Sequence, residues 1–484
     1  MLRFGTDGLR GVANAELTPE LALALGRAAV RVMGGDRYLV GRDTRRSGPL
    51  LEAALAAGLA GEGADVTLLG VVPTPEVAWW SAHEGLPAAM VSASHNPFPD
   101  NGIKLFSVGG RKLSDETESR LESELRRLLR DGALPTSAAR APTGSGVGWV
   151  APAARVHDGY AAAVIASLEG RRLDGLTAVV DCANGSASVI APRVLGDLGV
   201  DVHVLHARPD GANINDACGS THIGDLARTV VERGADLGVA FDGDADRVLL
   251  VDETGEVVDG DQIIALCAID RHDRRTLRED SVVVTVMTNL GFRLAMEKRG
   301  IHVVETKVGD RYVLEALEQR HLALGGEQSG HVIFRDLATT GDGLLTAVQV
   351  LDVVVRSGWP LATLATDAMI RLPQVLRNVR VAERDPAIVE RLAPRIAAVE
   401  RRLGDQGRVL VRPSGTEPLV RVMAEAPTAD EAEAAVADLV AAVEADAGGR
   451  RRGAGRPVSG AGPGSDRRPG AGTPPPGRGA RPRP

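Results

Sequence analysis

Ser94 follows a short apolar run and has the residue type that a nucleophile or a covalently modified hydroxyl requires. The run 88–91 predicts a buried strand, and the polar segment Ser92–Pro97 follows it directly. Ligands of α/β proteins bind in the crevice beyond the carboxyl ends of the strands, which is a suitable position for Ser94. The same segment is also ordinary turn chemistry, because Ser, Asn and Pro all favour turns. On these residues alone both interpretations stay open.

Asp242, Asp244 and Asp246 form an acidic turn between the apolar runs 237–241 and 248–251. Alternating carboxylates in a tight turn can direct their oxygens at one hard cation, and without a cation they would repel one another. A calcium loop fits poorly, because a non-glycine residue stands where that loop needs Gly and strands flank the turn. Mg²⁺ suits a site with few carboxylates and a phosphate oxygen. The alternative is a solvated acidic turn.

A third cluster combines basic, hydroxyl and glycine residues near the C-terminal end of the chain. Its members are Arg412, Ser414, Gly415, Thr416 and Arg421. Arginine provides two parallel donors to an anion, hydroxyls add further donors, and Gly lets backbone N–H groups approach. The pattern therefore predicts a phosphate-binding loop, although a hairpin turn with surface arginines remains an equal alternative.

Glu327, Ser329 and His331 alternate after a Gly-Gly pair, and they could bind the hydroxyl or amino groups of a polar substrate. His331 could also move a proton near neutral pH. Lys104 lies ten residues after Ser94, and Arg10 lies in a Gly-rich N-terminal segment where it could contact phosphate. For each of these residues a turn or surface position is the alternative. Neither a P-loop nor a G-x-G-x-x-G fingerprint occurs, and no serine-hydrolase triad is evident.

Strands that alternate with helices predict βαβ units and largely parallel sheets. We expect three α/β units and one smaller α+β unit, with boundaries at 1–150, 151–252, 253–366 and 367–446. Helices are predicted from Thr18 and at 47–61, 115–130, 188–198, 224–233, 261–269, 290–298, 310–319, 387–403 and 429–443. Strands are predicted at 38–40, 66–69, 88–91, 176–181, 200–205, 237–241, 281–286, 301–305, 322–324 and in a pair around 412–421. Each unit carries one of the four polar clusters, so the clusters could converge on one cleft.

Charge is distributed unevenly along the chain. Residues 447–484 hold nine Arg and one acidic residue, a charge of +8, and since the whole chain carries −8 the remainder carries −16. Because its Gly/Pro/Arg composition cannot bury enough apolar surface, we expect 447–484 to be a disordered tail. An acidic body argues against nucleic acid as the main partner. Three widely spaced cysteines, no apolar run of about 18 residues and no signal segment favour a cytoplasmic protein without a membrane partner.

The residues alone thus indicate a metal-dependent enzyme that acts on a phosphorylated polar small molecule. The four clusters together resemble the α-D-phosphohexomutase superfamily, and within it the bacterial phosphoglucosamine mutase branch. The resemblance extends from Phe4 to about Glu444. Its anchors are Phe4–Gly11, Ser92–Phe106, Asn213–His222, Phe241–Arg247, Val308–Val313, Gly325–His331, Thr339–Gly343 and Arg412–Met423.

The resemblance implies four domains around a central cleft and a phosphoserine at Ser94. It implies one Mg²⁺ per chain, held by the Ser94 phosphate and by Asp242, Asp244 and Asp246. The implied reaction interconverts glucosamine 6-phosphate and glucosamine 1-phosphate through a bisphosphate. The resemblance implies that Arg10 and Arg247 neutralise charge and that Lys104 and His331 act as acid or base. It implies sugar binding by Glu327 and Ser329. The residues that it implies for phosphate binding are Arg412, Ser414, Gly415, Thr416 and Arg421.

Several alternatives remain open at this point. Gln328 resembles the glucosamine branch, but a phosphoglucomutase/phosphomannomutase, a catalytically silent sugar-phosphate-binding protein and a metal phosphatase are rival functions. Pro99 departs from the family pattern, in which an aromatic residue is more usual, and the tail is foreign to it. The expected partners are small sugar phosphates, and a homo-oligomer stays open.

Overall fold

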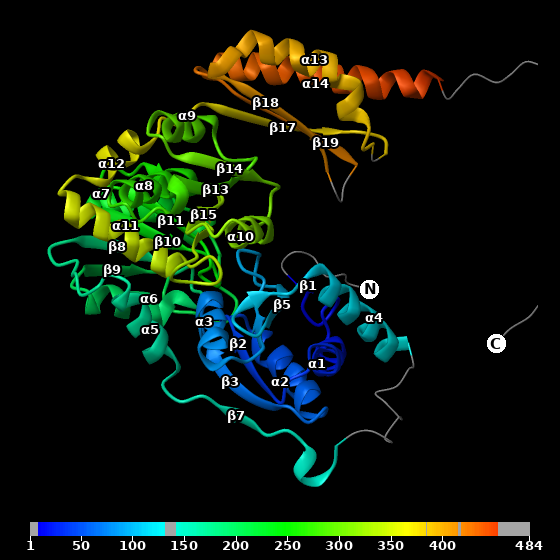
Figure 1. Cartoon of the computed structure of the whole chain (residues 1–484). Coiled ribbons are helices and arrows are strands. Elements are labelled where there is room, and N and C mark those ends of the chain that lie inside the picture. The colour runs from blue at the N-terminus through cyan, green and yellow to red at the C-terminus, as the bar shows by residue number, and fades with distance from the viewer. Residues whose placement is uncertain (1–7, 131–141, 384, 415–417, 454–484) are drawn as a thin grey trace, which may run out of the picture. The chain divides into compact units, whose positions relative to one another are not determined.

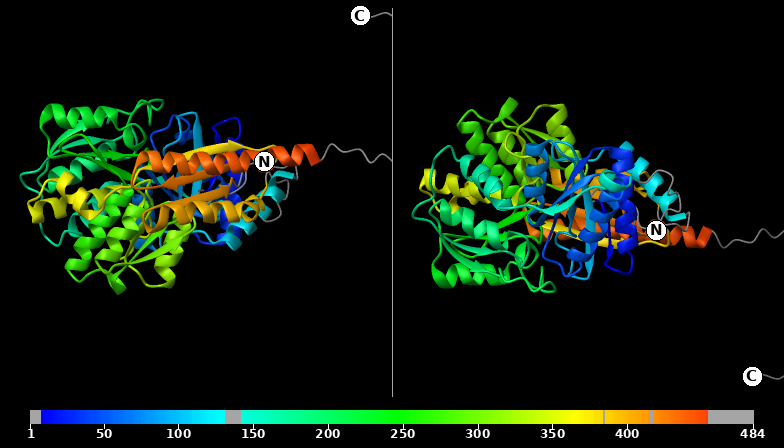
Figure 2. Two further views of the ribbon diagram at one scale, coloured as in Figure 1. Left: turned by 90° about the horizontal axis from the view of Figure 1, so that it is seen from above. Right: turned by 90° about the horizontal axis from the view of Figure 1, so that it is seen from below.

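The structure, a computed structural model, describes residues 8–130, 142–383, 385–414 and 418–453 (Figure 1). The chain divides into two compact units, 1–373 and 374–484. The first unit contains three mixed sheets with helices between and around them, and the second contains one antiparallel sheet (Figures 1 and 2). The predicted fold class, three α/β sheets followed by a smaller α+β part, is confirmed.

The first sheet has the strand order β1-β5-β4-β2-β3-β7, with β6 paired to β5. Its strands are β1 (Leu9–Val12), β2 (Arg37–Arg42), β3 (Asp65–Val71), β4 (Ala88–Val91), β5 (Asp100–Ser107), β6 (Arg111–Lys112) and β7 (Val150–Pro152). Its helices are α1 (Pro19–Met33), α2 (Gly48–Ala60), α3 (Thr74–Glu84) and α4 (Asp115–Arg130), and the 3₁₀ turn η1 is Gly144–Gly146. Strands β4, β2, β3 and β7 run parallel, whereas β5 is antiparallel to β4 and sets Lys104 opposite Met90. This register brings Lys104 back to the end of the strand that precedes Ser94.

The second sheet has the order β12-β11-β10-β8-β9, with a parallel core of β10, β8 and β9. Its strands are β8 (Thr177–Asp181), β9 (Asp201–Leu205), β10 (Leu237–Phe241), β11 (Val248–Asp252) and β12 (Val257–Val258). Its helices are α5 (Val156–Ala166), α6 (Ala187–Asp197), η2 (Gly219–Thr221) and α7 (Gly224–Arg233). The antiparallel hairpin of β10 and β11 pairs Phe241 with Val248 and so closes the acidic turn between them.

The third sheet has the order β14-β13-β15-β16. Its strands are β13 (Ser281–Thr285), β14 (His302–Thr306), β15 (Leu324–Gly326) and β16 (Val332–Phe334). Its helices are α8 (Gly260–Asp273), η3 (Arg278–Asp280), α9 (Leu290–Lys298), α10 (Asp310–Gln319), α11 (Gly343–Ser357) and α12 (Leu361–Ala368). The antiparallel pair β15 and β16 closes the turn that carries Glu327 and Ser329.

The second unit has an antiparallel sheet of order β17-β19-β18. Its strands are β17 (Gln374–Arg380), β18 (Arg408–Pro413) and β19 (Leu419–Glu425), and its helices are α13 (Ile388–Leu403), η4 (Gly404–Gln406) and α14 (Ala429–Gly453). Both long helices lie on one face of this sheet (Figures 1 and 2). The core between them is built from aliphatic residues such as Val422, Val436 and Leu439.

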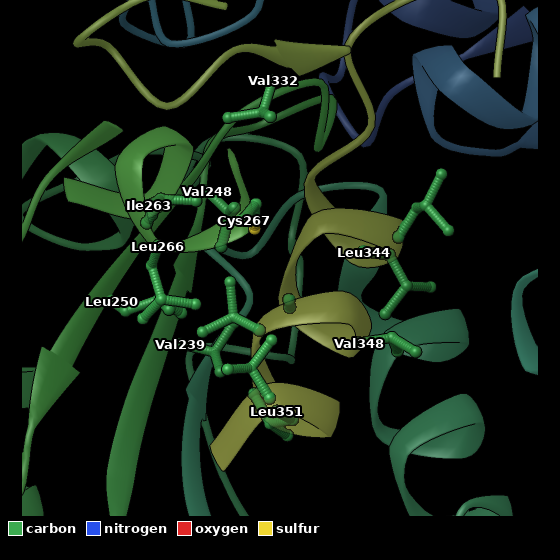
Figure 3. Packing of buried hydrophobic residues seen from close by; sticks show 14 of the residues in the cluster. Val239, Val248, Leu250, Ile263, Leu266, Cys267, Val332, Leu344, Val348 and Leu351 are labelled. Atoms are coloured by element: carbon green, nitrogen blue, oxygen red, sulfur yellow. The ribbon is translucent and has the colours of Figure 1, made fainter. Parts of the chain in front are cut away.

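Local sequence signals fix the ends of several helices. Thr18 caps α1 by accepting a hydrogen bond from the Leu21 N–H, and a proline occupies the first turn. Asp259 and Gln262 form a capping box at the start of α8. The largest core cluster spans the second and third sheets, and α8 and α11 contribute Ile263 and Leu351 to it (Figure 3).

Some predicted borders differ from the structure. The predicted divisions at 150/151 and 366/367 fall inside β7 and α12, and the four-part division stays a prediction. The tail boundary at 447 needs correction, because α14 continues to Gly453. The arginines at 450–452 favour a helix, although Gly448 and Gly449 before them do not. The rest of the predicted tail, 454–484, lies outside the described residues.

No single described helix is long and apolar enough to cross a membrane. The bent pair of α11 and α12 passes that test by length and composition only. Residues along α11, such as Leu345, Val348 and Leu351, are buried in the core cluster of the second and third sheets.

Candidate active site

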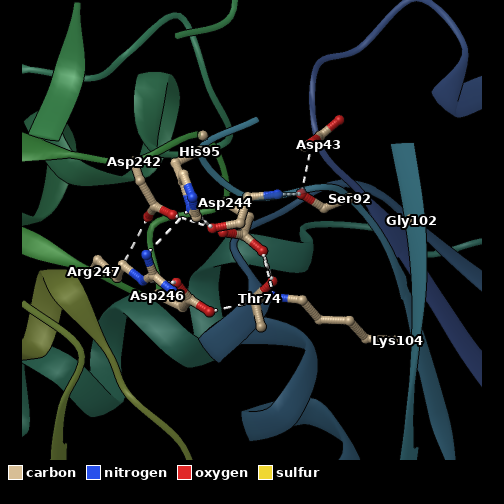
Figure 4. A network of polar contacts seen from close by, with 12 residues as sticks. Asp43, Thr74, Ser92, His95, Gly102, Lys104, Asp242, Asp244, Asp246 and Arg247 are labelled. Atoms are coloured by element: carbon tan, nitrogen blue, oxygen red, sulfur yellow. Dashed lines mark hydrogen bonds and ion pairs between the residues drawn. The ribbon is translucent and has the colours of Figure 1, made fainter. Parts of the chain in front are cut away.

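Ser94 lies in a left-handed backbone conformation, with φ of 53°, and its side chain is buried. Its hydroxyl donates to Asp242 Oδ2 across 2.5 Å. Its N–H donates to the Ser92 hydroxyl at 2.9 Å, and that hydroxyl donates to Asp43 Oδ2 at 2.6 Å (Figure 4). A left-handed backbone conformation is energetically unfavourable for a residue other than glycine. The surrounding contacts must therefore hold the turn in place.

Arg45 provides most of those contacts. Its guanidinium is fully buried and donates to the carbonyls of four residues of the serine loop, at 2.5–3.1 Å. These carbonyls belong to Ser94, Asn96, Pro97 and Asp100. Its Nε donates to Asp43 at 2.9 Å, so the buried charge is paired. The Asp43–Arg45 pair thus fixes the loop that presents the Ser94 hydroxyl.

The three aspartates of the acidic turn lie buried beside Ser94, and one oxygen from each lies within 4.8 Å of the others. Asp244 Oδ1 and Asp246 Oδ1 are buried and accept no hydrogen bond from the described residues. Burial, together with the charges of Asp246 and Asp244, raises the pKa of Asp242 well above its usual range. Buried carboxylate oxygens without donors are costly, and a cation among them would satisfy them. The turn is therefore able to bind a metal ion.

Lys104 contacts the same carboxylates from the neighbouring sheet. Its Nζ lies 2.9 Å from Asp244 Oδ2 and 3.3 Å from Asp246 Oδ2, and it is almost completely buried (Figure 4). The Thr74 hydroxyl also donates to Asp244 Oδ2, at 2.6 Å. Residues from two sheets, 140 positions apart in sequence, therefore share one cluster of charge.

His331 also lies close to Asp246. Its Nδ1 is 3.8 Å from Asp246 Oδ2, and its Nε2 is 3.5 Å from Asp310 Oδ2. Burial alone would lower the pKa of His331, but Asp246 and Asp310 outweigh it and raise that pKa. The Gly341 N–H donates to Nε2 at 3.1 Å, which fixes the ring in place. The structure thus holds an imidazole and an ammonium near the same carboxylate oxygen of Asp246.

Arg247 and Arg10 add positive charge near Ser94, where His95 also lies. Arg247 Nη1 lies 3.2 Å from His95 Nδ1, and that ring nitrogen lies 3.4 Å from the Ser94 hydroxyl. Burial, and then the charges of Arg247 and Arg10, lower the pKa of His95. A neutral His95 leaves the two arginines as the cations that face an anionic group on Ser94.

The turn 327–330 is connected to the acidic turn through the backbone. The Val248 N–H donates to the Gly330 carbonyl at 3.1 Å, and a side chain at Gly330 would collide with the Val248 carbonyl. Glu327 accepts from the Gly309 N–H at 3.0 Å. The Ser329 hydroxyl is buried without a hydrogen-bond partner among the described residues. Glu327 and Ser329 thus stand beside the site with hydrogen-bonding capacity to spare.

The phosphate-binding residues predicted near the C-terminal end lie in the second unit. Arg412 and Arg421 are directly opposite each other on β18 and β19. Burial, and then Arg421, lower the pKa of Arg412. Like charges on facing positions destabilise a sheet, and Arg421 Nε is buried without a described hydrogen-bond partner. Ser414 is buried beside them, whereas Gly415 and Thr416 lie outside the described residues.

Sequence reasoning missed Asp43, Arg45, Thr74, Asp310 and Gly341. The segment 41–45 follows a predicted strand, so its position at the carboxyl end of that strand was an available signal. Asp310 and Gly341 lie within two anchors of the family resemblance, Val308–Val313 and Thr339–Gly343, but received no role. For Thr74 the sequence carries no distinctive spacing.

Four phosphoglucomutase/phosphomannomutase family models match the chain in order. They are alpha/beta/alpha domain I over residues 1–130, domain II over 158–255, domain III over 259–372 and the C-terminal domain over 376–443. A phosphoglucosamine mutase of Frankia casuarinae is 56% identical over 454 residues, which are 91% of this chain and 97% of the relative. The chain belongs to the phosphoglucosamine mutase family. The relative from Streptomyces coelicolor is 51% identical over 455 residues, 92% of this chain and 99% of its own length.

Solved structures of the wider family share the fold. A phosphoglucomutase/phosphomannomutase family protein of Burkholderia thailandensis aligns with a TM-score of 0.75 at 26% identity, covering 91% of this chain and 97% of that one. An Aspergillus fumigatus N-acetylphosphoglucosamine mutase, in complex with GlcNAc-6P and magnesium, aligns with a TM-score of 0.64 at 20% identity, covering 93% and 96%. Membership of the phosphoglucosamine mutase family makes the chain an enzyme of the mutase, or isomerase, class, as the sequence predicts.

Proposed function

We propose that the chain interconverts glucosamine 6-phosphate and glucosamine 1-phosphate through a phosphoserine at Ser94 and a sugar bisphosphate. The observation that carries the proposal is the 2.5 Å contact between the Ser94 hydroxyl and Asp242, within a buried turn of three aspartates. A phosphoryl group on this hydroxyl would lie at the edge of a site able to bind a metal ion. The family membership supplies the substrate class.

Mg²⁺ fits the acidic turn, because its donors are all oxygens and two of them are buried without hydrogen bonds. Asp242, Asp244 and Asp246, with the Ser94 phosphate, would hold one ion per chain. When bound, Mg²⁺ supplies positive charge that stabilises the transferring phosphoryl group. Lys104 contacts two of these carboxylates and limits the charge that remains uncompensated.

The transfer step requires in-line positioning and charge neutralisation more than covalent chemistry. A sugar hydroxyl oxygen bonds to phosphorus, the bond from phosphorus to the Ser94 oxygen breaks, and the hydroxyl proton passes to a base. The second transfer runs in reverse, from the other phosphate of the bisphosphate back to Ser94. Lys104 and His331 are the acid and base, and Arg10 and Arg247 neutralise developing charge.

The remaining predicted residues bind the parts of the substrate that do not react. Glu327 and Ser329 bind the sugar, and Gln328 beside them favours the amino sugar. Arg412, Ser414, Gly415, Thr416 and Arg421 bind the phosphate that is not transferred. The bisphosphate must turn over between the two transfers, so this phosphate has to be released and bound again.

The localisation and the partners follow from the composition of the chain and from its substrate. The enzyme acts in the cytoplasm on small sugar phosphates, without a nucleic-acid or membrane partner. Intact-mass analysis tests the phosphoserine, and a mutase assay with glucosamine, glucose and mannose phosphates, primed with a bisphosphate, tests the substrate.

We expect one phosphate per chain and fastest turnover with glucosamine phosphate. Ser94→Ala should lose that phosphate and at least about a thousandfold in turnover, with unchanged circular dichroism, since the covalent carrier is gone. Ser92→Ala serves as the neighbouring control and should keep the phosphate. Near-wild-type turnover of Ser94→Ala would overturn the mechanism, and faster turnover of glucose or mannose phosphates would overturn the substrate.

A further inference from the structure

A second group of metal-binding residue types lies in the second sheet, apart from the acidic turn. Asp181 ends β8, His206 follows β9 and Cys218 precedes η2. Strands β8 and β9 are parallel neighbours, so their carboxyl ends meet at one edge. One donor atom from each of the three residues lies within 4.8 Å of the other two. An oxygen, a nitrogen and a sulfur atom therefore face one point.

The Asp181 carboxylate is fully buried and held in a fixed orientation. Its Oδ1 accepts from the Ala183 N–H at 2.8 Å, and its Oδ2 accepts from the Gly219 N–H at 2.9 Å. Among the described residues its one ion-pair partner is His206, and no lysine or arginine compensates its charge. Carboxylates that bind metals are commonly oriented by hydrogen bonds of this kind, while free lone pairs face the ion.

His206 presents an unsatisfied nitrogen to the same point. Its Nδ1 lies 3.0 Å from Asp181 Oδ2 as an ion-pair contact, and this buried atom has no hydrogen-bond partner among the described residues. Its Nε2 lies on the Asp225 side, 3.9 Å from that carboxylate. A proton on His206 Nε2 faces the negative charge of Asp225. The lone pair on Nδ1 is then available to bind a cation together with Asp181 and Cys218. The side chain is 27% exposed, so solvent reaches the group.

We propose that Asp181, His206 and Cys218 bind a divalent cation of zinc-like preference, with water as the fourth ligand. Carboxylate, imidazole and thiolate are the ligands of tetrahedral Zn²⁺, at about 2.0–2.3 Å from the metal. Carboxylate and thiolate together neutralise the two charges of the ion. Binding of the ion to the Cys218 sulfur requires the thiolate, so the thiol proton would be released to solvent when the metal binds. The acidic turn, with oxygen donors alone, prefers Mg²⁺ instead.

This cation would stabilise the segment that supports the Ser94 loop. Asn215, three residues before Cys218, donates to the Ser94 carbonyl at 2.9 Å and to the Asn96 carbonyl at 3.1 Å. The Asn215 N–H is itself bound to the Ala183 carbonyl at 3.0 Å, beside Asp181. Cross-linking β8, His206 and Cys218 through one ion therefore fixes Asn215 against the serine loop. The ion has a positioning role and takes no part in the transfer.

Cobalt titration of the purified full-length protein, with Mg²⁺ in excess, tests the site. A thiolate-to-cobalt charge-transfer band should rise to one equivalent per chain and disappear when Zn²⁺ is added. Carboxylate ligands give no such band, so Co²⁺ in the acidic turn does not contribute. Ser94→Ala should retain the band, which separates this site from the proposed mutase chemistry.

Cys218→Ala should abolish the band, and His206→Gln, a change at a partly exposed side chain, should weaken cobalt binding at least tenfold. Cys182→Ala and Cys267→Ala remove the other two buried thiols and are the matched controls, which should keep it. Thermal unfolding midpoints establish that each variant is folded. Absence of the band from the wild-type protein, or its persistence in folded Cys218→Ala, would overturn the proposal.

Discussion

Ser94 depends on residues that the sequence does not bring near it. The acidic turn and the serine loop could be found from their spacing, because each is a compact run after an apolar strand. Arg45 could not, because its role depends on complete burial and on four carbonyls 49 to 55 positions further along the chain. Arginine is among the residue types least often buried, and sequence pattern places it on the surface.

Arg45→Lys should lower kcat at least tenfold with little change in KM. A lysine ammonium cannot reach four carbonyls and Asp43 together, so the Ser94 turn loses its fixed geometry while the substrate-binding residues stay in place. Arg46→Lys, at the exposed neighbouring position, is the control and should behave as wild type. Steady-state kinetics check the prediction, and an unchanged kcat in a folded Arg45→Lys protein would contradict it.

Arg412 and Arg421 face each other on β18 and β19. Replacing one of them should lower activity without lowering stability. Arg421→Met removes a like-charge pair, so the thermal unfolding midpoint should stay the same or rise. It also removes charge-assisted hydrogen bonds to phosphate, worth about 1.5–3 kcal/mol, so kcat/KM should fall roughly 10- to 150-fold. Arg377→Met, on the neighbouring strand and ion-paired with Glu433, is the control and should leave kcat/KM unchanged.

At the scale of the elements, the strands before each polar cluster could be predicted, but several helices could not. The strands at 88–91, 237–241 and 281–285 are apolar runs bounded by turn residues, and the structure forms them there. Helix α11 was not predicted; its many valines favour strands in general, and in the structure most of its residues are buried in the core. The glycines around strand β1 favour a turn, so the sequence does not predict this strand; in the structure it pairs with β5, close to the backbone of that strand.

The segment before α11 supports His331, which gives a test of positioning by backbone. A β-carbon at Gly341 would lie 2.4 Å from His331 Nε2, so Gly341→Ala must displace the imidazole. We expect kcat to fall roughly a hundredfold, as a misplaced catalytic group does. Gly196→Ala is the control, because open space surrounds that helical glycine and its stability should rise by up to about 1 kcal/mol. Equal activity of the two variants would exclude this role.

The cap of α11 also makes stability depend on pH. Burial raises the pKa of Asp342 to about 6, from an ordinary value of 3.8. The folded protein therefore holds this proton more tightly than the unfolded chain, so the free energy of unfolding falls as pH rises from about 4 to 6, by up to roughly 3 kcal/mol. Asp342→Asn should remove that decline while Asn still caps the helix.

Urea unfolding of both proteins between pH 4 and 7 measures the effect. Tyr160→Phe should have the opposite effect on this pH dependence. The Tyr160 hydroxyl donates to both Asp342 oxygens at 2.9 Å and so stabilises the charged form of the Asp342 carboxylate. Its loss should raise the pKa of Asp342 further and extend the decline above pH 6. Parallel pH profiles for wild type and Asp342→Asn would contradict the assignment.

At the scale of the whole molecule, the chain combines an acidic body with a basic C-terminal segment. The four family matches end at 443, and the described part of α14 ends at Gly453. Residues 454–484 are dominated by Gly, Pro and Arg, which bury little apolar surface, so they contribute little to the stability of any of the four sheets. Their positive charge is the property most able to act on other molecules.

Deletion of 454–484 should therefore leave mutase turnover within about twofold of wild type and leave the unfolding midpoint unchanged, because the deleted residues lie outside all four matched domains. The full-length chain should be retained on a heparin column at low salt and released well below physiological ionic strength, as expected for weak contacts of exposed charges. The deleted chain, which keeps the acidic body, should flow through. A loss of turnover beyond tenfold on deletion would show instead that the basic segment takes part in catalysis.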